Sequence, residues 1–559
     1  MNLQERERRM YMNNQKLAEL LFPNITKTIE DLEKEYPKRE LKEGAMVTRF
    51  APSPTGFVHL GSLYTSFICE RFARQSNGVF YLRIEDTDQV RIVENGITGI
   101  IEDLKSFQIN FDEGESIGGA YGPYTQSKRK EIYQVFMKYL VLNGFAYPCF
   151  YTKEELETLR KEQEEKKERL GVYGKYAKYR NLTIEQIEEK INEKIPFVLR
   201  LKSPGQFEKT IEVKDMIKGK IKFPENDMDV VIMKQDGLPT YHFAHVVDDY
   251  LMHTTHVLRG DEWLSSLPIH IQLFQVLKLK TPKYAHVSPL TKKDGNTTRK
   301  LSKRHDPECA ISYYREAGIP KEALKIYFST LMNPNFEPFY MSNRNIKIED
   351  FKFEFSKMPV GGTLFDLDKL LSISKTYLSR LTNTEIYEEM LSYYQQYDLD
   401  FAKLMEKYKE KTLLALNIER EVKRPRKDFS VYADMKKELW YFYDELFDLE
   451  QVYKTVEYKK TYQAQFLKDY ITNYYCITDD HDTWYEKIKE CASKYGYCSS
   501  VKEYKEAENQ YIGHIGDACE CIRVSVTTSL MTPDLYEVLK VLGVQTVQKR
   551  IEVFCQNID

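Results

Sequence analysis

The feature that most constrains the fold is a strand–turn–helix unit near the start of the chain, "VTRFAPSPTGFVHLGSL", which runs from Val47 to Leu63. "MVTRF" predicts a strand, "PSPTG" predicts a stiff turn, and a helix is expected from about His59 to Gln75. A second strand, "GVFYLRIEDTD", and a second helix, "IVENGITGIIEDLKSF", continue the alternation. This alternation favours a parallel sheet with crossover helices.

The turn after the first strand has the chemistry of a phosphate site. Pro52 and Pro54 stiffen it, Gly56 permits unusual backbone angles, and a helix N-terminus attracts anions. His59 can donate a hydrogen bond to a phosphate as charge moves in a transition state, and Gly61 lets a nucleotide approach the backbone. The alternative is an incidental histidine on a surface turn, and local chemistry alone leaves the two interpretations even.

The alternation is interrupted once and then resumes. Residues 112–225 contain Gly-rich turns and a charged helix, "KEELETLRKEQEEKKERL", after which strand-like runs return in "DVVIMKQDGLPTYHFAHVVDD" and "HTTHVLRGDEW". Beyond about residue 330 the pattern is helical, and residues 1–45 are expected to form one amphipathic helix and a polar connector. Since 559 residues exceed one ordinary core, we expect a doubly wound α/β domain, split by an insertion and followed by helical bundles.

The composition indicates the class of protein and the cellular compartment. The chain is 42% apolar and 30% charged, which is typical of a globular protein, and its net charge of −3 leaves room for a local basic face that binds nucleic acid. Nine cysteines without a CxxC pair favour a reducing compartment, so the cytoplasm is expected. The N-terminus lacks the apolar core of a secretory signal, and no run of about 18 apolar residues predicts a membrane span.

Two motifs resemble the signatures of the class I aminoacyl-tRNA synthetases. "RFAPSPTGFVHLGSL" resembles the first signature in its glutamyl and glutaminyl form, with His59-Leu60-Gly61-Ser62 where the family has His-Ile-Gly-His. The small residue in place of the second histidine is similar to the glutamyl branch. "KLSKR", which starts at Lys300, resembles the second signature, Lys-Met-Ser-Lys-Ser. Alone it would be interpreted as solvated surface, because 82 of the residues are Lys or Arg.

The resemblance implies an ATP site and an electrostatic mechanism. ATP would be bound by His59, Gly61, Ser62 and Lys303, and the catalytic residues would be His59, Lys300 and Lys303. A mobile loop would close over the triphosphate, where Lys303 neutralises the departing pyrophosphate with support from Lys300. "DGNTTR" is expected to be its flexible lead-in. Mg²⁺ would accompany ATP.

Further stretches, "LRIEDTDQVR", "PTYHFAHVVDD" and "THVLRGDEW", resemble the glutamyl and glutaminyl subgroup. Arg259 would favour glutamate, because glutamine would leave its charge unpaired; glutaminyl enzymes lack an arginine there. The alternative for Arg259 and Glu85 is a structural salt bridge. His245 stands where some members have Asn, and it either contacts the substrate or is a histidine of the core. The implied glutamate-binding residues are Arg49, Ala51, Ser53, Glu85, Tyr241, His245 and Arg259.

Some members of the family carry a zinc site in the insertion, which begins with a Cys-x-Cys pair. Here "YPCFYTKEEL" has Cys149, but Tyr151 stands where the second cysteine would be. One cysteine cannot make a tetrahedral site, so we expect no zinc and no other protein-bound metal.

The tail resembles the helical anticodon-binding domain of the bacterial glutamyl type, through "EVKRPRKDFSVYADM" and the final helical stretch; glutaminyl and archaeal-type enzymes end in β-barrels. The tail contains a basic run, for which two interpretations stay open: it contacts tRNA phosphates, or it is a solvated face. The run consists of Lys423, Arg424, Arg426 and Lys427. The expected domains are an N-terminal extension (1–45), two catalytic halves (46–111 and 226–330), an acceptor-end-binding insertion (112–225), a stem-contact region (331–410) and an anticodon-binding domain (411–559).

The chain is thus identified as a member of the bacterial-type glutamyl-tRNA synthetases. This membership implies that a cytoplasmic monomer attaches L-glutamate to tRNA(Glu) through glutamyl-adenylate, with ATP as the energy source. Three alternatives stay open: that the enzyme also charges tRNA(Gln), that it is a glutaminyl-tRNA synthetase, and that it is a non-catalytic tRNA-binding paralogue.

Overall fold

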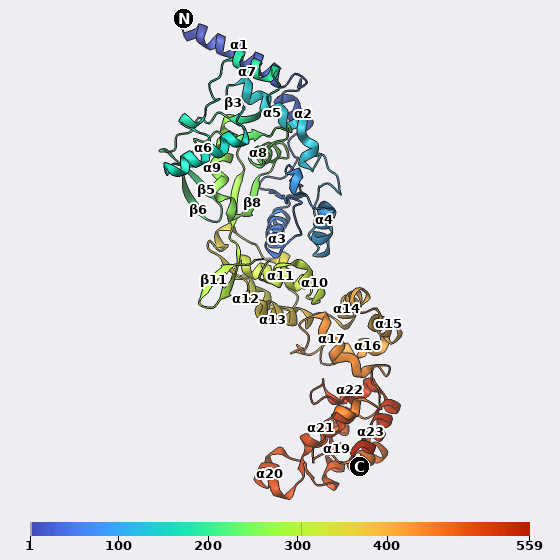
Figure 1. Ribbon diagram of the computed structural model, residues 1–559. Coiled ribbons are helices and arrows are strands. Elements are labelled where there is room, and N and C mark those ends of the chain that lie inside the picture. Colours follow the sequence, from blue (N-terminus) through green and yellow to red (C-terminus); the bar gives the residue numbers. More distant parts are fainter. Residues whose placement is uncertain (1–2, 303, 559) are drawn as a thin grey trace. The chain divides into compact units, whose positions relative to one another are not determined.

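The computed structural model describes residues 3–302 and 304–558 (Figure 1). The chain divides into two compact units, the first made of Met1–Tyr313 and Lys325–Asp366, the second of Tyr314–Leu324 and Leu367–Asp559. The strands β1, β2, β8 and β9, which pair in parallel, belong to the first unit, and helices make up most of the second. The predicted α/β class, a parallel sheet followed by a helical region, is therefore confirmed.

Four parallel strands form the centre of the first unit. β1 (Val47–Phe50) is buried along its whole length and pairs in parallel with β2 (Val79–Leu82). β8 (His256–Gly260) pairs in parallel with β9 (Lys283–Val287). Thr255 joins the two pairs, because its N–H donates to Val47 O at 3.0 Å and its hydroxyl accepts from Val47 N at 2.8 Å. The carboxyl ends of β1, β2 and β8 therefore meet at one edge, where α/β proteins bind ligands.

The helices of this sheet begin where the sequence predicts them. α3 (Leu60–Gln75) starts at His59, whose backbone is extended (φ −116°), and its buried face lies against β1, where Thr48 Oγ1 donates to Cys69 O at 2.8 Å. The predicted helix from about His59 to Gln75 is confirmed. The other helices of the layer are α4 (Gly96–Ser106), α8 (Tyr241–Leu251) and α9 (Leu267–Val276).

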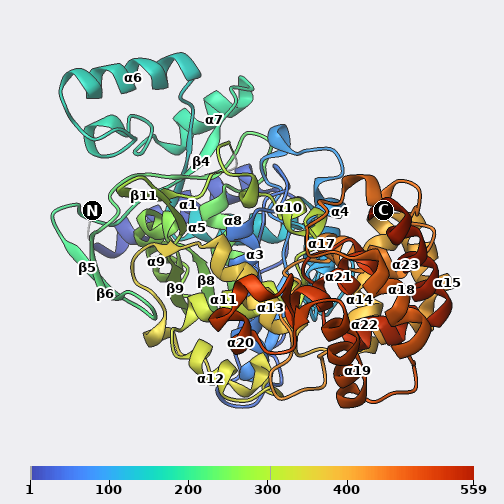
Figure 2. The same ribbon diagram turned by 90° about the horizontal axis from the view of Figure 1, so that it is seen from below.

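The inserted segment has its own antiparallel sheet. β3 (Ala146–Cys149), β4 (Val198–Leu201) and β7 (Val231–Met233) pair in that order, so this sheet continues past the expected boundary at residue 225. The predicted charged helix is present as α6 (Lys153–Glu165), whose capping box is formed by Thr152 and Glu155. Figure 2 shows α6 set apart from the parallel strands. The segment also contains α5 (Lys130–Leu142) and α7 (Ile184–Asn192).

A hairpin of the same segment extends the parallel sheet. β5 (Thr210–Asp215) and β6 (Gly219–Pro224) pair with each other, and β5 also joins β9 through Asp215 and Tyr284. Met216 N donates to Tyr284 O at 2.8 Å and continues this contact. The hairpin thereby carries Asp215 into the interior of the first unit, where it is 1% exposed.

The N-terminal extension is more structured than expected. α1 (Leu3–Leu21) is followed by a second helix, α2 (Ile29–Glu35), so the prediction of a polar connector is wrong at these residues. Thr28 and Asp31 form a capping box that starts α2, a local signal that the sequence carries. Buried residues of both helices share one apolar core with α5, which makes the extension an integral part of the first unit.

The second unit is built from short helices around an aromatic core. Many of its tyrosines are buried, and several of them bind backbone carbonyls; Tyr453, for example, donates to Ser525 O at 2.6 Å. One exception to the all-helical expectation is a parallel pair of two-residue strands, β13 (Tyr497–Cys498) and β14 (Gly513–His514). The helices are α13 (Leu367–Leu378), α14 (Asn383–Tyr397), α15 (Leu399–Lys407), α16 (Lys409–Asn417), α17 (Tyr432–Leu439), α18 (Ala464–Asp469), α19 (His481–Lys494), α20 (Val501–Glu506), α21 (Ile515–Thr527), α22 (Leu535–Leu542) and α23 (Val544–Ile558).

The remaining elements follow the parallel sheet in the chain. They are β10 (Leu290–Asp294), β11 (Thr297–Lys300), α10 (Ile311–Glu316), α11 (Lys321–Met332), α12 (Phe336–Ser342) and β12 (Thr363–Leu364). Of the helices in the described part of the chain, none combines the length and the apolar character needed to cross a membrane.

Candidate active site

A cavity of about 570 Å³ opens at the carboxyl ends of β1, β2 and β8. It gathers residues from both signatures and from the substrate stretches, although these are up to about 250 residues apart in the chain. His245 does not line it, and Lys303 lies outside the described residues. The predicted residues that line the cavity are Arg49, Ala51, Ser53, His59, Gly61, Ser62, Glu85, Tyr241, Arg259 and Lys300.

His59 caps the helix that begins the site. Its Nδ1 accepts a hydrogen bond from Ser62 N at 3.1 Å, so the neutral ring carries its proton on Nε2, which lies 3.1 Å from Ser62 Oγ. A Cβ added at Gly61 would lie 3.2 Å from the ring, which is tighter than ordinary contact. Gly61 therefore makes room for the His59 imidazole, a role that the sequence analysis did not identify.

Behind the cavity lies a network of buried charges. Asp249 of α8 accepts from Arg49 Nε at 3.1 Å and from Arg83 Nη1 at 2.7 Å. Arg83 also donates to Glu85 Oε1 at 2.9 Å, and Asp248 accepts from Arg129 Nε at 2.7 Å. Three guanidinium groups thus face three carboxylates, a balance that lets all of them be buried. No motif in the sequence predicted roles for Arg83, Arg129, Asp248 and Asp249. The signal for the aspartates is an acidic pair within an apolar helix.

The network shifts the pKa values of Asp249 and Glu85 in opposite directions. Burial opposes ionisation of Asp249, but Arg49 and Arg83 outweigh it and lower the pKa of Asp249 to about 2. Burial raises the pKa of Glu85 above its ordinary value, although Arg83 and Arg49 act against this effect. Glu85 is consequently less firmly ionised than Asp249.

Arg259 differs from these arginines because its partners are neutral. Its Nε donates to His286 Nε2 at 3.0 Å and its Nη1 to His270 Nδ1 at 3.1 Å. Tyr241 and the backbone carbonyl of Trp263 are its other acceptors, at 3.5 and 3.3 Å. No carboxylate of the described residues pairs with this guanidinium, which is 6% exposed and borders the cavity. The cavity therefore presents a positive charge that calls for an anionic ligand.

The structural alternative, a salt bridge, holds for Glu85, which pairs with Arg83 at 2.9 Å. Among the described residues, Arg259 forms no such salt bridge. His245 is fully buried, with its Nδ1 3.1 Å from Asp249 Oδ2 and its Nε2 3.1 Å from Tyr284 OH. Burial, and then Arg259 and Arg49, lower the pKa of His245 well below its ordinary value. The structure therefore places His245 in the core behind the cavity.

The segment before the second signature is a hairpin rather than the expected flexible lead-in. β10 and β11 pair from Thr291 with Lys300 to Asp294 with Thr297, and Gly295 makes the tight turn at φ +59°. After the hairpin, Asp306 accepts from Arg299 at 2.6 and 2.8 Å and from Ser302 N at 2.9 Å. Lys300 is exposed and its Nζ lies 4.0 Å from Glu262.

The four basic residues predicted to touch tRNA lie in the second unit and differ in their surroundings. Lys423 and Arg424 are exposed, whereas Arg426 is half-buried and paired with Asp428. Lys427 donates to Thr376 Oγ1 at 3.0 Å. Lys423 and Arg424 are the better placed of the four for contact with phosphates.

The expected absence of zinc stays a prediction. Among the described residues, no three His, Cys, Asp or Glu side chains form a group that fits a metal ion. Cys149 is buried and accepts from Arg200 Nε at 3.3 Å, and Tyr151 donates to Tyr176 O at 2.9 Å. Both side chains therefore have partners within the protein.

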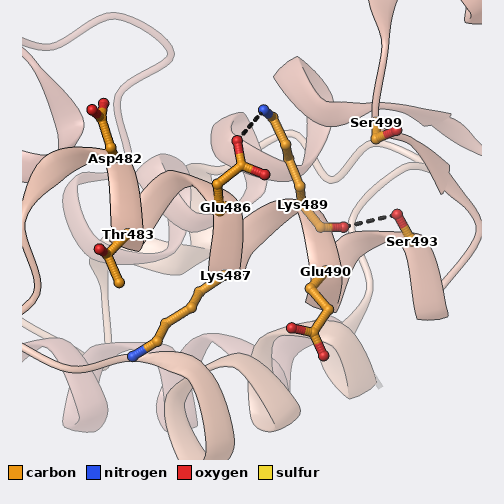
Figure 3. A pocket seen from close by; sticks show the side chains of 8 residues that line it. All are labelled: Asp482, Thr483, Glu486, Lys487, Lys489, Glu490, Ser493 and Ser499. Carbon is orange, nitrogen blue, oxygen red and sulfur yellow. Dashed lines mark hydrogen bonds and ion pairs between the residues drawn. The ribbon is translucent and has the colours of Figure 1, made fainter.

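A larger hollow, of about 850 Å³, lies on α19 in the second unit. Figure 3 shows charged side chains of both signs along the helix, with Lys489 bonded to Glu486. Such mutual pairing is typical of a solvated helix face, so this hollow has no catalytic chemistry of its own. It is lined by Asp482, Thr483, Glu486, Lys487, Lys489, Glu490, Ser493 and Ser499.

Comparison with known proteins agrees with the site. Residues 45–353 match the family described as "tRNA synthetases class I (E and Q), catalytic domain". The chain is 46% identical to the glutamate–tRNA ligase of Clostridium perfringens strain 13, over 97% of this chain and 100% of that protein. The glutamate–tRNA ligase of Acetivibrio thermocellus is 44% identical over 97% of this chain and 100% of its own length. Part of the N-terminal extension is therefore shared with these relatives, because the unmatched 3% is shorter than 45 residues.

Solved structures give the same result. A crystal structure of a glutamate tRNA ligase from Elizabethkingia meningosepticum, in complex with its amino acid, superposes with a TM-score of 0.73 at 28% identity. The similarity covers 92% of this chain and 100% of that one. The resemblance of the two signatures is thus confirmed at the level of the whole chain, which belongs to the class I tRNA synthetases of the glutamyl and glutaminyl (E and Q) family.

Proposed function

We propose that this protein is a glutamate–tRNA ligase that attaches glutamate to tRNA(Glu) in two steps, through glutamyl-adenylate. The names of its relatives support this reaction, and so does the meeting of both signatures at one cavity. The observation that carries the proposal is Arg259, a buried guanidinium at the cavity wall without a carboxylate partner among the described residues. A glutamate side chain supplies the missing negative charge.

In the first step the glutamate α-carboxylate attacks the α-phosphorus of ATP and pyrophosphate leaves. His59, with its proton on Nε2, donates to a phosphate oxygen, and Lys300 stabilises negative charge from the end of β11. Lys303 is proposed to act with Lys300. ATP brings Mg²⁺ with it as the magnesium complex. In the second step a hydroxyl of the terminal adenosine of tRNA takes the glutamyl group and AMP leaves.

The charged groups of glutamate are held by groups of the opposite charge. Arg259 and Tyr241 receive the side-chain carboxylate, while Glu85 accepts from the α-ammonium group. Ala51 and Ser53 line the turn beside them, and Arg49 borders the same wall with its charge already paired to Asp249. Glutamine is rejected because its neutral amide leaves the Arg259 charge unpaired.

The parts of the chain beyond this site are proposed to bind tRNA. Residues 112–225 would receive the acceptor end, 331–410 the stem and 411–559 the anticodon. Lys423 and Arg424 are the proposed phosphate contacts. We propose a cytoplasmic monomer, for which the nine free thiols are the supporting observation on compartment. Charging of tRNA(Gln) is a second candidate activity of the same site.

The test is charging of purified tRNA(Glu) and tRNA(Gln), in separate reactions, with labelled glutamate and ATP. Label on tRNA(Glu) alone supports a discriminating enzyme. Label on both supports the wider activity and implies an amidotransferase that corrects the product. Label on neither tRNA, with glutamine accepted instead, would overturn the proposal and the role of Arg259.

A further inference from the structure

Arg259 is held by a chain of side chains that runs back into the inserted segment. Arg259 Nε donates to His286 Nε2 at 3.0 Å, and His286 Nδ1 lies 2.7 Å from Asp215 Oδ2. A guanidinium nitrogen only donates, so His286 Nε2 must accept. The proton of the neutral ring is therefore on Nδ1, where it is donated to Asp215. The carboxylate selects the tautomer that Arg259 requires.

The position of Asp215 is fixed by backbone groups. Ile217 N and Lys218 N donate to its Oδ1 at 2.9 and 2.8 Å, and His286 N donates to its Oδ2 at 3.1 Å. Burial disfavours the ionised form, but His286 and these amides hold the pKa of Asp215 below its ordinary value. The side chain is thus an ionised, immobile acceptor beneath His286.

A second histidine holds Arg259 from the other side. His270 Nδ1 accepts from Arg259 Nη1, which leaves the His270 proton on Nε2, 3.0 Å from His242 Nδ1. Burial lowers the pKa of His270 well below its ordinary value and that of His242 to about 4. The partners of Arg259 are therefore neutral acceptors, which orient the guanidinium without cancelling its charge.

We propose that Asp215, which the inserted segment contributes, is a positioning residue for recognition of the glutamate side chain: it fixes the tautomer of His286 and so the orientation of Arg259. The inference rests on the proposed function of the site. Arg259 faces the distal carboxylate, away from the reacting phosphorus, so its contact is equally strong in the ground state and the transition state. Loss of this contact then raises KM for glutamate and leaves kcat unchanged.

The principal test is Asp215→Asn. The amide oxygen still accepts from Ile217 N and Lys218 N. The amide nitrogen now donates to His286 Nδ1 and can no longer accept from His286 N, which donates to Oδ2 in the wild type. The proton of His286 therefore moves to Nε2, where it faces the Nε–H group of Arg259. His286 Nε2 can then no longer accept the hydrogen bond from Arg259. KM for glutamate is expected to rise about 10- to 100-fold, by analogy with the effect of removing carboxylates that orient metal-binding histidines. The values of kcat and KM for ATP are expected to stay within about threefold of wild type.

His286→Gln provides the rescue. The glutamine Oε1 takes the place of Nε2 as an acceptor and needs no carboxylate to set a tautomer. KM for glutamate in the double variant is therefore expected to equal that of His286→Gln alone. Glu212→Gln is the matched control, since Glu212 lies on the same strand, is exposed and pairs with Lys220 at 2.8 Å; its kinetics are expected to be unchanged.

Several outcomes would overturn the inference: an unchanged KM for glutamate in Asp215→Asn, a fall in kcat at constant KM, or an equal effect of Asp215→Asn with and without His286→Gln. If Asp215→Asn does not fold, His286→Leu removes the same acceptor, and an unchanged KM there is equally decisive. ¹⁵N NMR of labelled histidine reads the tautomer of His286 directly. Failure of the wild type to charge tRNA would overturn the proposed function. The tautomer of His286 would still show whether Asp215 orients His286 and Arg259, so the two failures are distinguishable.

Discussion

At the scale of single residues, the site is organised by how each buried charge is compensated. Arg49 and Arg83 share Asp249, whereas Arg259 has histidines as partners. A guanidinium that already has a carboxylate is structural, and one without it is available to a ligand. The same residue type therefore serves two purposes around one cavity, and the difference lies in the partners.

Asp249→Asn tests the structural half of this statement. The variant removes the buried carboxylate that pairs with Arg49 and leaves Arg83 with Glu85 as its hydrogen-bonded carboxylate, so we expect a loss of about 3–5 kcal/mol in the free energy of unfolding. Urea denaturation measures it. Glu162→Gln, which removes an exposed pair with Lys166, is the control and is expected to cost under about 0.5 kcal/mol. A loss below about 1 kcal/mol in Asp249→Asn would contradict the interpretation.

The pH dependence of stability should depend on buried neutral histidines such as His256. Burial, followed by Lys283, lowers the pKa of His256 to about 4. In the unfolded chain its pKa is about 6.5, so the unfolded state binds more protons between these values. The stabilisation is complete above about pH 6.5 and is lost as the pH falls toward about 4.

Between pH 7 and pH 5 we expect His256 to account for a loss of about 1–2 kcal/mol in the free energy of unfolding. His256→Gln removes the titrating group, so its free energy of unfolding should fall by that much less over the same interval. Urea denaturation at the two pH values gives the comparison. Parallel curves for the two proteins would show that His256 does not stay neutral in the folded state.

At the scale of elements, the strand–turn–helix unit positions the groups that are proposed to bind the nucleotide, and it does so through one helix cap. His59 ends the turn, caps α3 and lies over Gly61, so three local features depend on one side chain. A glycine this early in a helix costs some stability and is explained here by the space that the imidazole takes.

Gly61→Ala is expected to displace the His59 ring, because the new Cβ would lie 3.2 Å from it. A shift of about 1 Å in a catalytic group can cost about 100-fold, so kcat/KM for ATP should fall by that order. Pyrophosphate exchange into ATP, with tRNA present, measures it. Gly99→Ala in α4 is the control: its Cβ meets nothing within 4 Å, and the helix should gain up to about 1 kcal/mol. Equal activity of both variants would refute the role of the cap.

At the scale of the whole molecule, a net charge of −3 requires that tRNA be bound by local basic groups. In the second unit, Arg426 forms an ion pair with Asp428, whereas Lys423 and Arg424 are exposed and have no ion pair within the part of the chain that the structure describes. Phosphate contacts release counterions, so their number appears in the salt dependence of binding.

The double variant Lys423→Gln with Arg424→Gln should weaken tRNA binding. It should also reduce the slope of log K against log salt by about 0.7–0.9 for each lost contact. Filter binding at several salt concentrations gives the slope. Lys403→Gln with Lys437→Gln is the charge-matched control, because both lysines pair with an aspartate on their own helix. An equal loss of slope in the control would mean that total charge alone matters.

Several features were predictable from the sequence because their causes are local. The turn of prolines and glycine, the helix after it and the second strand are determined within about 35 residues, so α3 and β2 appear where expected. The residues that line the cavity were predictable for the same reason, because each belongs to a motif that lies on one continuous segment of the chain. The capping box of α2 was an equally local signal that the analysis overlooked.

The partners of these residues were decided only by the tertiary structure. Arg49 and Asp249 are 200 residues apart, and Asp215 reaches His286 through a hairpin that joins the edge of the sheet. Periodicity and turn chemistry report on neighbours in the chain, whereas pairing of buried charges depends on which distant elements pack together. The sequence alone therefore determined which of the predicted residues could be found through motifs, and the fold decided which arginine of the cavity lacks a carboxylate partner among the described residues.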